Sequence, residues 1–143
     1  MRAKLFLGVS LLLTVLLGGY ASYTQAARKN APVFYFKIAP VDPRALLSGD
    51  YMSLSYDIEN RSDSRENPML FYAAENGVVQ TEKTNQPVKI AYHGWRFKLP
   101  HQFYFQEGTG KKYETAVYAK MRRLPDGRFL IDALTDEQFN EIK

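Results

Sequence analysis

The chain begins with a continuous apolar run and then changes to short stretches in which apolar and polar residues alternate. Residues 5–23 carry no charge and follow a start that contains Arg2 and Lys4. At about 1.5 Å of rise per residue, a helix over this run is long enough to cross the hydrocarbon core of a bilayer. The pattern predicts an N-terminal transmembrane helix, with residues 1–27 as a membrane anchor.

A cleaved signal peptide is the alternative interpretation of this segment, because several small residues follow the apolar run between positions 19 and 27. The anchor is favoured because the run is long for a signal peptide and lacks an A-x-A cleavage pattern, and because Tyr20 and Tyr23 suit a membrane interface. A buried helix of a soluble protein is the third interpretation, but no polar side is visible. We expect a single-pass protein of the cytoplasmic (inner) membrane, with its domain on the periplasmic, extracytoplasmic side.

The remaining residues, 28–143, predict one small antiparallel β-rich domain, because aromatic and β-branched runs alternate with turn signals. The clearest alternation predicts a strand over residues 50–58. One face of that strand carries Asp50, Met52, Leu54, Tyr56 and Ile58, and the other carries Tyr51, Ser53, Ser55 and Asp57. Further strands are expected over residues 33–39, 69–74, 78–84, 88–97, 102–107, 115–122 and 128–134. A sandwich and a partly open barrel both fit this spacing.

Turns and short helices separate the predicted strands. Asn76-Gly77 and Pro125-Asp126-Gly127 are typical of hairpin turns, and residues 59–67 contain no apolar side chain, which predicts a solvated loop. Single helical turns are expected over residues 44–47 and 111–116. Thr135 followed by two acidic residues predicts a short terminal helix that runs through residue 142.

Composition narrows the class of protein. Hydrophobic residues make up 45% of the chain and aromatic residues 14%, which excludes a disordered protein. The formal net charge of +4 includes Arg2 and Lys4, which precede the apolar run, so the domain has a mixed surface and no nucleic-acid partner is expected. The absence of cysteine excludes disulfides, thiolate chemistry and cysteine-based zinc sites.

No catalytic constellation is visible. His93 and His101 are the only histidines, they match no H-E-x-x-H spacing, and a zinc site would need Glu107 as a further ligand. Residues 107–112 superficially resemble a phosphate loop without its spacing. Nearby serines such as Ser53 and Ser55 would suit a Ser/Lys hydrolase, but no motif places a lysine. No catalytic residue, metal or cofactor is therefore predicted, and an enzyme is the less favoured interpretation.

Residues 49–56 carry a recognisable signature. The residues Gly49, Asp50, Tyr51, Leu54 and Tyr56 spell the motif for which the GDYXXLXY family is named, and the chain resembles that family. The stretches 40–44, 103–108 and 126–127 resemble the family pattern as well, so the similarity covers nearly the whole chain. It implies a bacterial membrane-anchored or exported protein without an established activity, of a kind often encoded beside multi-spanning membrane proteins. It implies no catalytic residues.

The resulting hypothesis is an uncharacterised envelope protein that serves as a non-catalytic binding or accessory module for a multi-spanning membrane protein. The residues proposed for binding are Asp42, Arg44, Asp50, Tyr51, His101 and Glu107. The alternative is a hydrolase-like envelope enzyme with a carboxylate and histidine site drawn from Asp50, Glu107 and His101. A purely structural or stress-related envelope factor is the third possibility. Asp50 also has a structural interpretation, as an acceptor for turn amides or a partner of Arg44.

Overall fold

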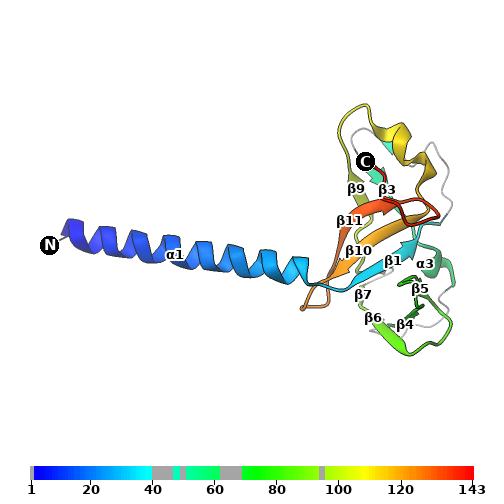
Figure 1. Ribbon diagram of the computed structural model, residues 1–143, viewed down its shortest axis with the longest axis horizontal. Helices are drawn as coiled ribbons and strands as arrows, with labels where there is room; N and C mark the ends of the chain where they lie inside the picture. Colours follow the sequence, from blue (N-terminus) through cyan, green and yellow to red (C-terminus); the bar gives the residue numbers. More distant parts are fainter. Residues whose placement is uncertain (1, 40–46, 49–50, 62–68, 94–95) are drawn as a thin grey trace. The chain divides into compact units, whose positions relative to one another are not determined.

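The structure is a computed structural model that describes residues 2–39, 47–48, 51–61, 69–93 and 96–143. The chain divides into two compact units, Met1–Ala31 and Pro32–Lys143. The first unit contains one long helix and the second contains the strands (Figure 1). Each unit is therefore described by itself.

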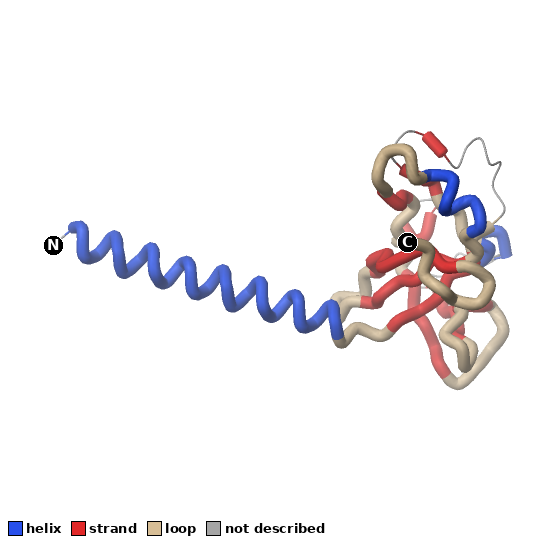
Figure 2. The backbone as a smooth tube through the Cα atoms, turned by 45° about the horizontal axis from the view of Figure 1, so that its top comes forward, coloured by secondary structure: helices blue, strands red, loops and turns tan. Residues whose placement is uncertain are grey.

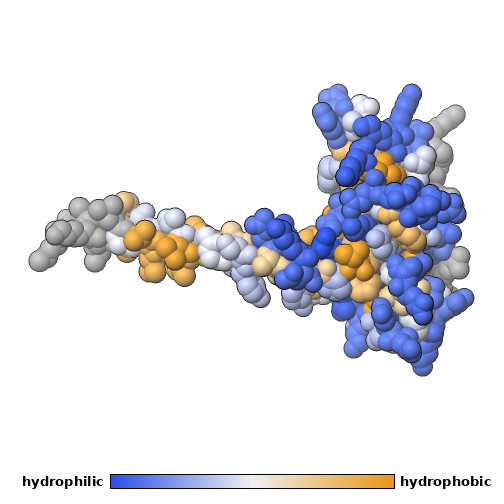
Figure 3. All heavy atoms as spheres, viewed as in Figure 1, coloured by the Kyte–Doolittle hydropathy of each residue, from blue (hydrophilic) through white to orange (hydrophobic). Residues whose placement is uncertain are grey.

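Helix α1 spans Arg2–Lys29. Some of its hydroxyl groups bond to the preceding turn: Thr14 donates a hydrogen bond to the carbonyl of Ser10 and Ser22 donates one to that of Gly18, both over 2.9 Å. Arg28 and Lys29 occupy the last turn, where positive charge suits the helix dipole. Figure 3 shows apolar side chains along the described helix and hydrophilic ones near its C-terminal end.

The membrane-spanning part of the predicted fold class is corrected by the structure. Over the described residues, no helix combines enough length with enough apolar character to cross a lipid bilayer. Within α1 the strongly apolar side chains end at Leu17, and the residues from Gly18 to Gln25 are mostly small or polar.

In its described residues, the domain is built from short strands and short helices that alternate with turns (Figure 2). The strands are β1 (Val33–Lys37), β2 (Leu47–Ser48), β3 (Tyr51–Ser53), β4 (Met69–Ala73), β5 (Val79–Gln80), β6 (Gln86–Ile90), β7 (Tyr92–His93), β8 (Arg96–Phe97), β9 (Gln102–Tyr104), β10 (Tyr118–Arg123) and β11 (Phe129–Thr135). The helices are α3 (Asp57–Arg61) and the 3₁₀ helix η1 (Gly110–Thr115). The predicted helical turn over residues 111–116 is confirmed.

These strands form small antiparallel sheets. Among the described residues, three sheets have three strands each, in the orders β1-β10-β11, β2-β3-β9 and β5-β4-β6, and β7 pairs with β8 in a two-stranded sheet. Isolated bridges join β1 to its neighbours: Tyr35 bridges Val78 in parallel and Ile38 bridges Tyr56 in antiparallel orientation. The predicted β-rich, antiparallel part of the fold class is confirmed.

One hydrophobic core gathers side chains from all of these sheets. The fully buried members with the largest side chains are Tyr56, Phe36, Phe71, Met52, Ile90, Met121, Leu134 and Val88. The alternation over residues 50–58 predicted the core face correctly, because Met52, Leu54, Tyr56 and Ile58 are all buried. Phe36 of β1 is buried, and its ring contacts those of Tyr56 and Phe129 edge-on. Packing at this point joins the motif to the β1-β10-β11 sheet.

Several predicted elements are wrong in detail. The strand expected over residues 50–58 ends at Ser53. Residues 59–61, expected to begin a loop, belong to helix α3. The strand expected over 88–97 is divided between β6, β7 and β8. The helical turn expected over 44–47 lies largely outside the described residues, and Leu47 itself belongs to β2.

The terminal helix is also wrong. Thr135 ends β11, and the chain then turns back so that Glu141 bridges Thr135. The cause is the carboxylate of Asp136, which accepts hydrogen bonds from the backbone amides of Gln138 and Asn140 at 2.9 Å. A side chain that binds nearby amides in this way competes with the helix.

Candidate functional site

Tyr56, the last residue of the motif, is buried in the core. Its hydroxyl donates a hydrogen bond to the carbonyl of Pro100, and its ring lies 5.9 Å from that of Phe36. Burial, and then the negative charge of Glu59, raise the pKa of the Tyr56 phenol well above its ordinary value. The hydroxyl therefore stays protonated and serves as a hydrogen-bond donor.

Glu59 links this tyrosine to a histidine. One carboxylate oxygen, Oε2, accepts a hydrogen bond from the backbone N–H of Tyr56 over 3.1 Å. The other, Oε1, lies 2.9 Å from Nε2 of His101. Tyr56 precedes the first residue of α3 and Glu59 is the third residue of that helix, so the carboxylate caps the helix as in a capping box.

His101 completes the arrangement from the segment before β9. Its ring centroid lies 5.7 Å from that of Tyr56, and its carbonyl accepts a hydrogen bond from the N–H of Leu54 over 2.8 Å. The side chains of His101 and Glu59 keep 20% and 17% exposure, so the pair reaches the surface beside a buried phenol. We call Tyr56, Glu59, Pro100 and His101 the Tyr56 cluster.

The chemistry open to the Tyr56 cluster follows from these bonds. The phenol of Tyr56 donates its hydrogen bond to the carbonyl of Pro100. The carboxylate of Glu59 contacts both the backbone amide of Tyr56 and the imidazole of His101. Within the described part of the chain, no group of three histidine or carboxylate side chains is placed to hold a metal ion. The cluster fixes the segment before β9 against the motif.

Tyr51, the other tyrosine of the motif, lies on the opposite face of β3. It pairs across the strands with Tyr104 of β9, with ring centroids 5.9 Å apart. Tyr104 is 68% exposed, and its hydroxyl donates a hydrogen bond to Oε1 of Gln102 over 2.9 Å. The two tyrosines of the motif therefore have different surroundings, one in the core and one toward solvent.

The other predicted site residues fall into two groups. Asp42, Arg44, Gly49 and Asp50 lie outside the described residues. Glu107 is exposed in the turn before Gly108, and the side chain paired with His101 is Glu59. The structure therefore brings His101 together with Glu59, a residue outside the predicted set.

Glu59 is the site residue that sequence reasoning missed, because the polar run after it indicated a loop. The signal that identifies it is spacing. An acidic residue three positions after the residue that begins a helix is the second half of a capping box. Tyr56 stands where a capping box carries serine or threonine, so the sequence holds only the glutamate half of that signature.

One shallow hollow lies beside α3, with a volume of about 210 Å³. Its lining comes from β1, α3, and the segment through β5, and consists of Lys37, Asp57, Ile58, Val78, Val79, Gln80, Thr81 and Glu82. Ligand pockets generally measure about 300–1,000 Å³, so this hollow is small for an organic ligand. None of the Tyr56 cluster residues lines it.

These observations define a β-rich domain whose signature motif is both a core element and a surface element. The chain belongs to the GDYXXLXY protein family, whose model matches residues 13–134. Comparison with curated proteins and with solved structures gives no match. The family assignment made from the motif is confirmed, and both tyrosine environments fall within the matched residues.

Proposed function

We propose that this protein is a non-catalytic binding or accessory module that uses helix α1 to dock on a multi-spanning membrane protein. The observation that carries the proposal is the exposure of the large apolar side chains of α1. They are 49% to 75% exposed and comprise Phe6, Val9, Leu11, Leu12, Leu13, Val15, Leu16, Leu17, Tyr20 and Tyr23. Side chains of this kind gain free energy when another apolar surface covers them.

The distribution of these side chains favours a partner made of several helices. Consecutive residues on a helix point about 100° apart, so the apolar triplets 11–13 and 15–17 together cover roughly two thirds of the circumference of α1. A single partner helix would cover one stripe and leave the others in water. A multi-spanning membrane protein offers a bundle of apolar helices, and such a bundle covers several sides of α1 at once.

The proposed location follows from the proposed partner. We place the domain on the extracytoplasmic side of the cytoplasmic membrane, next to the partner that holds α1. A fusion of alkaline phosphatase to the C-terminus would test the side, because that enzyme is active only after export. Enzyme activity supports the proposal, and an inactive but intact fusion contradicts it.

Co-purification from a mild detergent extract tests the docking itself. Changing Leu12 and Leu16 to glutamate places two charges on one side of α1, and we expect the double variant to lose the co-purifying membrane protein. Leu70→Glu is the matched control, because Leu70 is a 43% exposed leucine in the domain and should tolerate the charge. Recovery of a monomer with no enriched partner from several detergents would contradict the proposal.

A hydrolase-like activity is a second candidate, favoured by one observation. The carboxylate of Glu59 lies 2.9 Å from Nε2 of His101, so a carboxylate orients the imidazole as in a catalytic triad, but through the other ring nitrogen. Labelling with a fluorophosphonate probe tests it. Covalent labelling that His101→Gln abolishes while the fold is retained would favour the enzyme, and absence of labelling would favour the binding module.

A further inference from the structure

The last residues of the chain fold back over the outer face of the β1-β10-β11 sheet. Besides the bridge between Thr135 and Glu141, the N–H of Ile142 donates a hydrogen bond to the carbonyl of Leu134 over 2.9 Å. The N–H of Asp136 donates one to the carbonyl of Asn140 over 3.1 Å. We call residues 136–143 the C-terminal hook.

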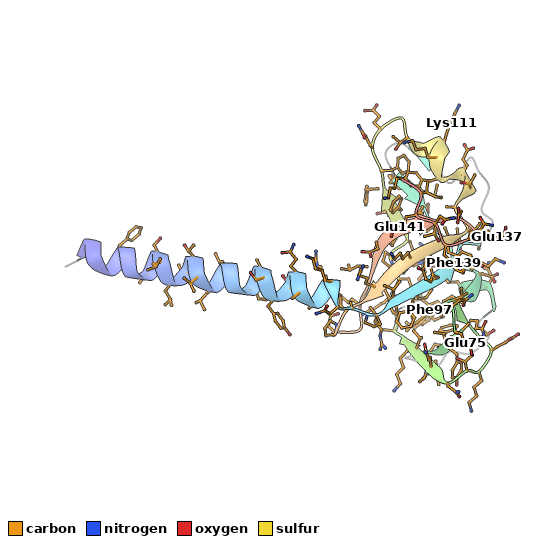
Figure 4. All side chains as sticks on the ribbon, in the orientation of Figure 1. Glu75, Phe97, Lys111, Glu137, Phe139 and Glu141 are labelled. Carbon is orange, nitrogen blue, oxygen red and sulfur yellow. The ribbon has the colours of Figure 1, made fainter. Side chains whose placement is uncertain are left out.

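Two side chains of the hook contact the sheet (Figure 4). The ring of Phe139 stacks on Tyr118 of β10 at 5.0 Å and meets Tyr35 of β1 edge-on at 4.8 Å. Two residues later, Oε1 of Glu141 accepts a hydrogen bond from Nζ of Lys120 over 2.7 Å. The sheet thus presents two aromatic rings and an ammonium group to one aromatic and one acidic side chain.

The three sheet residues form one surface because of strand register. Tyr118 and Lys120 are two positions apart on β10 and so share a face, and Tyr35 lies directly opposite Lys120 on β1. The hydrogen bond from Lys120 to Glu141 raises the pKa of the lysine and lowers that of the glutamate, so both groups stay charged over a wide pH range. An acidic group is therefore the natural complement of this surface.

The hook occupies this surface in a strained conformation. Phe139 has a φ of 65°, and it is the one described residue other than glycine with a positive φ. L side chains rarely adopt that region. The exposed carboxylate of Asp136 holds the loop, through the amides of Gln138 and Asn140 and the side chain of Asn140. A ligand with ordinary extended backbone would make similar contacts without this strain.

We propose that Tyr35, Tyr118 and Lys120 form a binding site for an extended segment of a partner protein, and that the hook covers this site until the partner arrives. The segment carries an aromatic residue and, two positions later, an acidic residue, because alternate residues of an extended chain point to the same side. The hook is an autoinhibitory contact that imitates this ligand. The site belongs to the domain alone and goes beyond the docking role proposed for α1.

A peptide competition experiment tests this inference on the full chain in detergent. The probe is a fluorescent peptide with the sequence of residues 135–143, TDEQFNEIK. In the double variant F139G/E141A the hook loses both contacts, while glycine adopts the positive φ easily. We expect the peptide to bind this variant about tenfold more tightly than the wild type, because apparent affinity falls with the fraction of open sites.

Two controls separate recognition from nonspecific binding. Adding Lys120→Ala to the double variant, or replacing the phenylalanine of the peptide by alanine, should each weaken binding. Equal peptide binding by the wild type and the folded double variant would overturn the proposal. A wild-type dimer that exchanges hooks between copies would overturn it as well, because the occupant would then be a second copy.

If the double variant does not fold, hydrogen exchange of the wild-type protein tests the proposal instead. Excess unlabelled peptide should displace the hook and speed hydrogen exchange at the amides of Asn140 and Ile142. Exchange that stays unchanged at saturating peptide would overturn the proposal.

Discussion

The two faces of the β1-β10-β11 sheet use similar aromatic contacts in different surroundings. On the core face, the ring of Phe36 lies 5.9 Å from that of Tyr56 and 5.3 Å from that of Phe129. On the outer face, Phe139 lies 4.8 Å from Tyr35 and 5.0 Å from Tyr118. The outer rings are closer together, but they are only half-buried.

The comparison teaches that burial, more than ring distance, decides how much each face stabilises the fold. Removal of apolar surface from water contributes roughly 25 cal/mol per Å², whereas the specific geometry of an aromatic pair adds only about 0.5–1.5 kcal/mol. The core face therefore holds the domain together, and the outer face can exchange one ligand for another without loss of the fold.

The two faces also use a carboxylate differently. Glu59 binds the backbone amide of a fully buried residue and connects it with His101. Asp136 binds the amides of an exposed loop. The first carboxylate supports the core and the second supports only the hook.

The largest effect is expected at Tyr56. Replacing Tyr56 by alanine removes a fully buried ring, which generally costs about 3–5 kcal/mol in the free energy of unfolding. Tyr56→Phe keeps the ring but leaves the carbonyl of Pro100 without its donor, at a cost of roughly 1–3 kcal/mol. Urea denaturation measures both losses. The comparison of the faces fails if Phe139→Ala destabilises the domain as much as Tyr56→Ala.

Glu59 should give the next largest effect. Glu59→Ala removes a helix cap together with the partner of His101, and we expect a loss of about 1–2 kcal/mol in the free energy of unfolding. Glu107→Ala is the control, because that glutamate is exposed in a turn and should change stability little. Equal stability of the two variants would show that the Tyr56 cluster contributes nothing to the fold.

The sequence predicted the positions of the core better than the type of each element. The alternation from Met52 to Ile58 gave the buried face correctly, because burial depends on which side a residue points to. It did not show that β3 stops at Ser53, since that depends on distant partners. The backbone N–H of Leu54 donates a hydrogen bond to the carbonyl of His101, and Tyr56 forms a β-bridge with Ile38. No local sequence pattern specifies these pairings.

The candidate site was only partly predictable for the same reason. The motif identified Tyr51 and Tyr56, and the scarcity of histidine drew attention to His101. Pairing His101 with Glu59 required the fold to bring together residues that are far apart in the sequence. The hook was predicted as a helix because Thr135 and the acids after it resemble a helix start, whereas Asp136 in fact binds the amides of a turn.

A smaller effect is expected at Gly77, which lies beneath an outer-face tyrosine. Its φ is 81°, and a Cβ there would lie 3.4 Å from Cδ2 of Tyr35, which is close to ordinary contact. Gly77→Ala should therefore destabilise the domain through backbone strain, by about 1 kcal/mol. Thermal unfolding measures the loss. Gly8→Ala is the control, because that glycine lies within α1 with open space around it, and a similar loss there would argue against strain as the cause.

The smallest effect concerns the hook alone and depends on pH. Hydrogen bonds from the side chain and backbone of Asn140 and from the backbone of Gln138 lower the pKa of Asp136 below its ordinary value. The carboxylate therefore favours the closed hook above the ordinary pKa of about 4, and this contribution is lost as the pH falls through the lower pKa of the folded state. Ring-proton NMR shifts of Phe139 should report the opening between neutral and strongly acidic pH.

The rings of the core provide the internal reference for that titration. The shifts of Phe36 should stay constant while those of Phe139 change, because opening the hook leaves the core packed. Asp136→Asn should abolish the transition, whereas Glu141→Gln should leave most of it, although the pKa of Glu141 is lowered too by its hydrogen bond to Lys120. If the ring-proton shifts of Phe36 and Phe139 change over the same pH range, acid unfolds the whole domain. The hook is then part of the fold and not a separable cover.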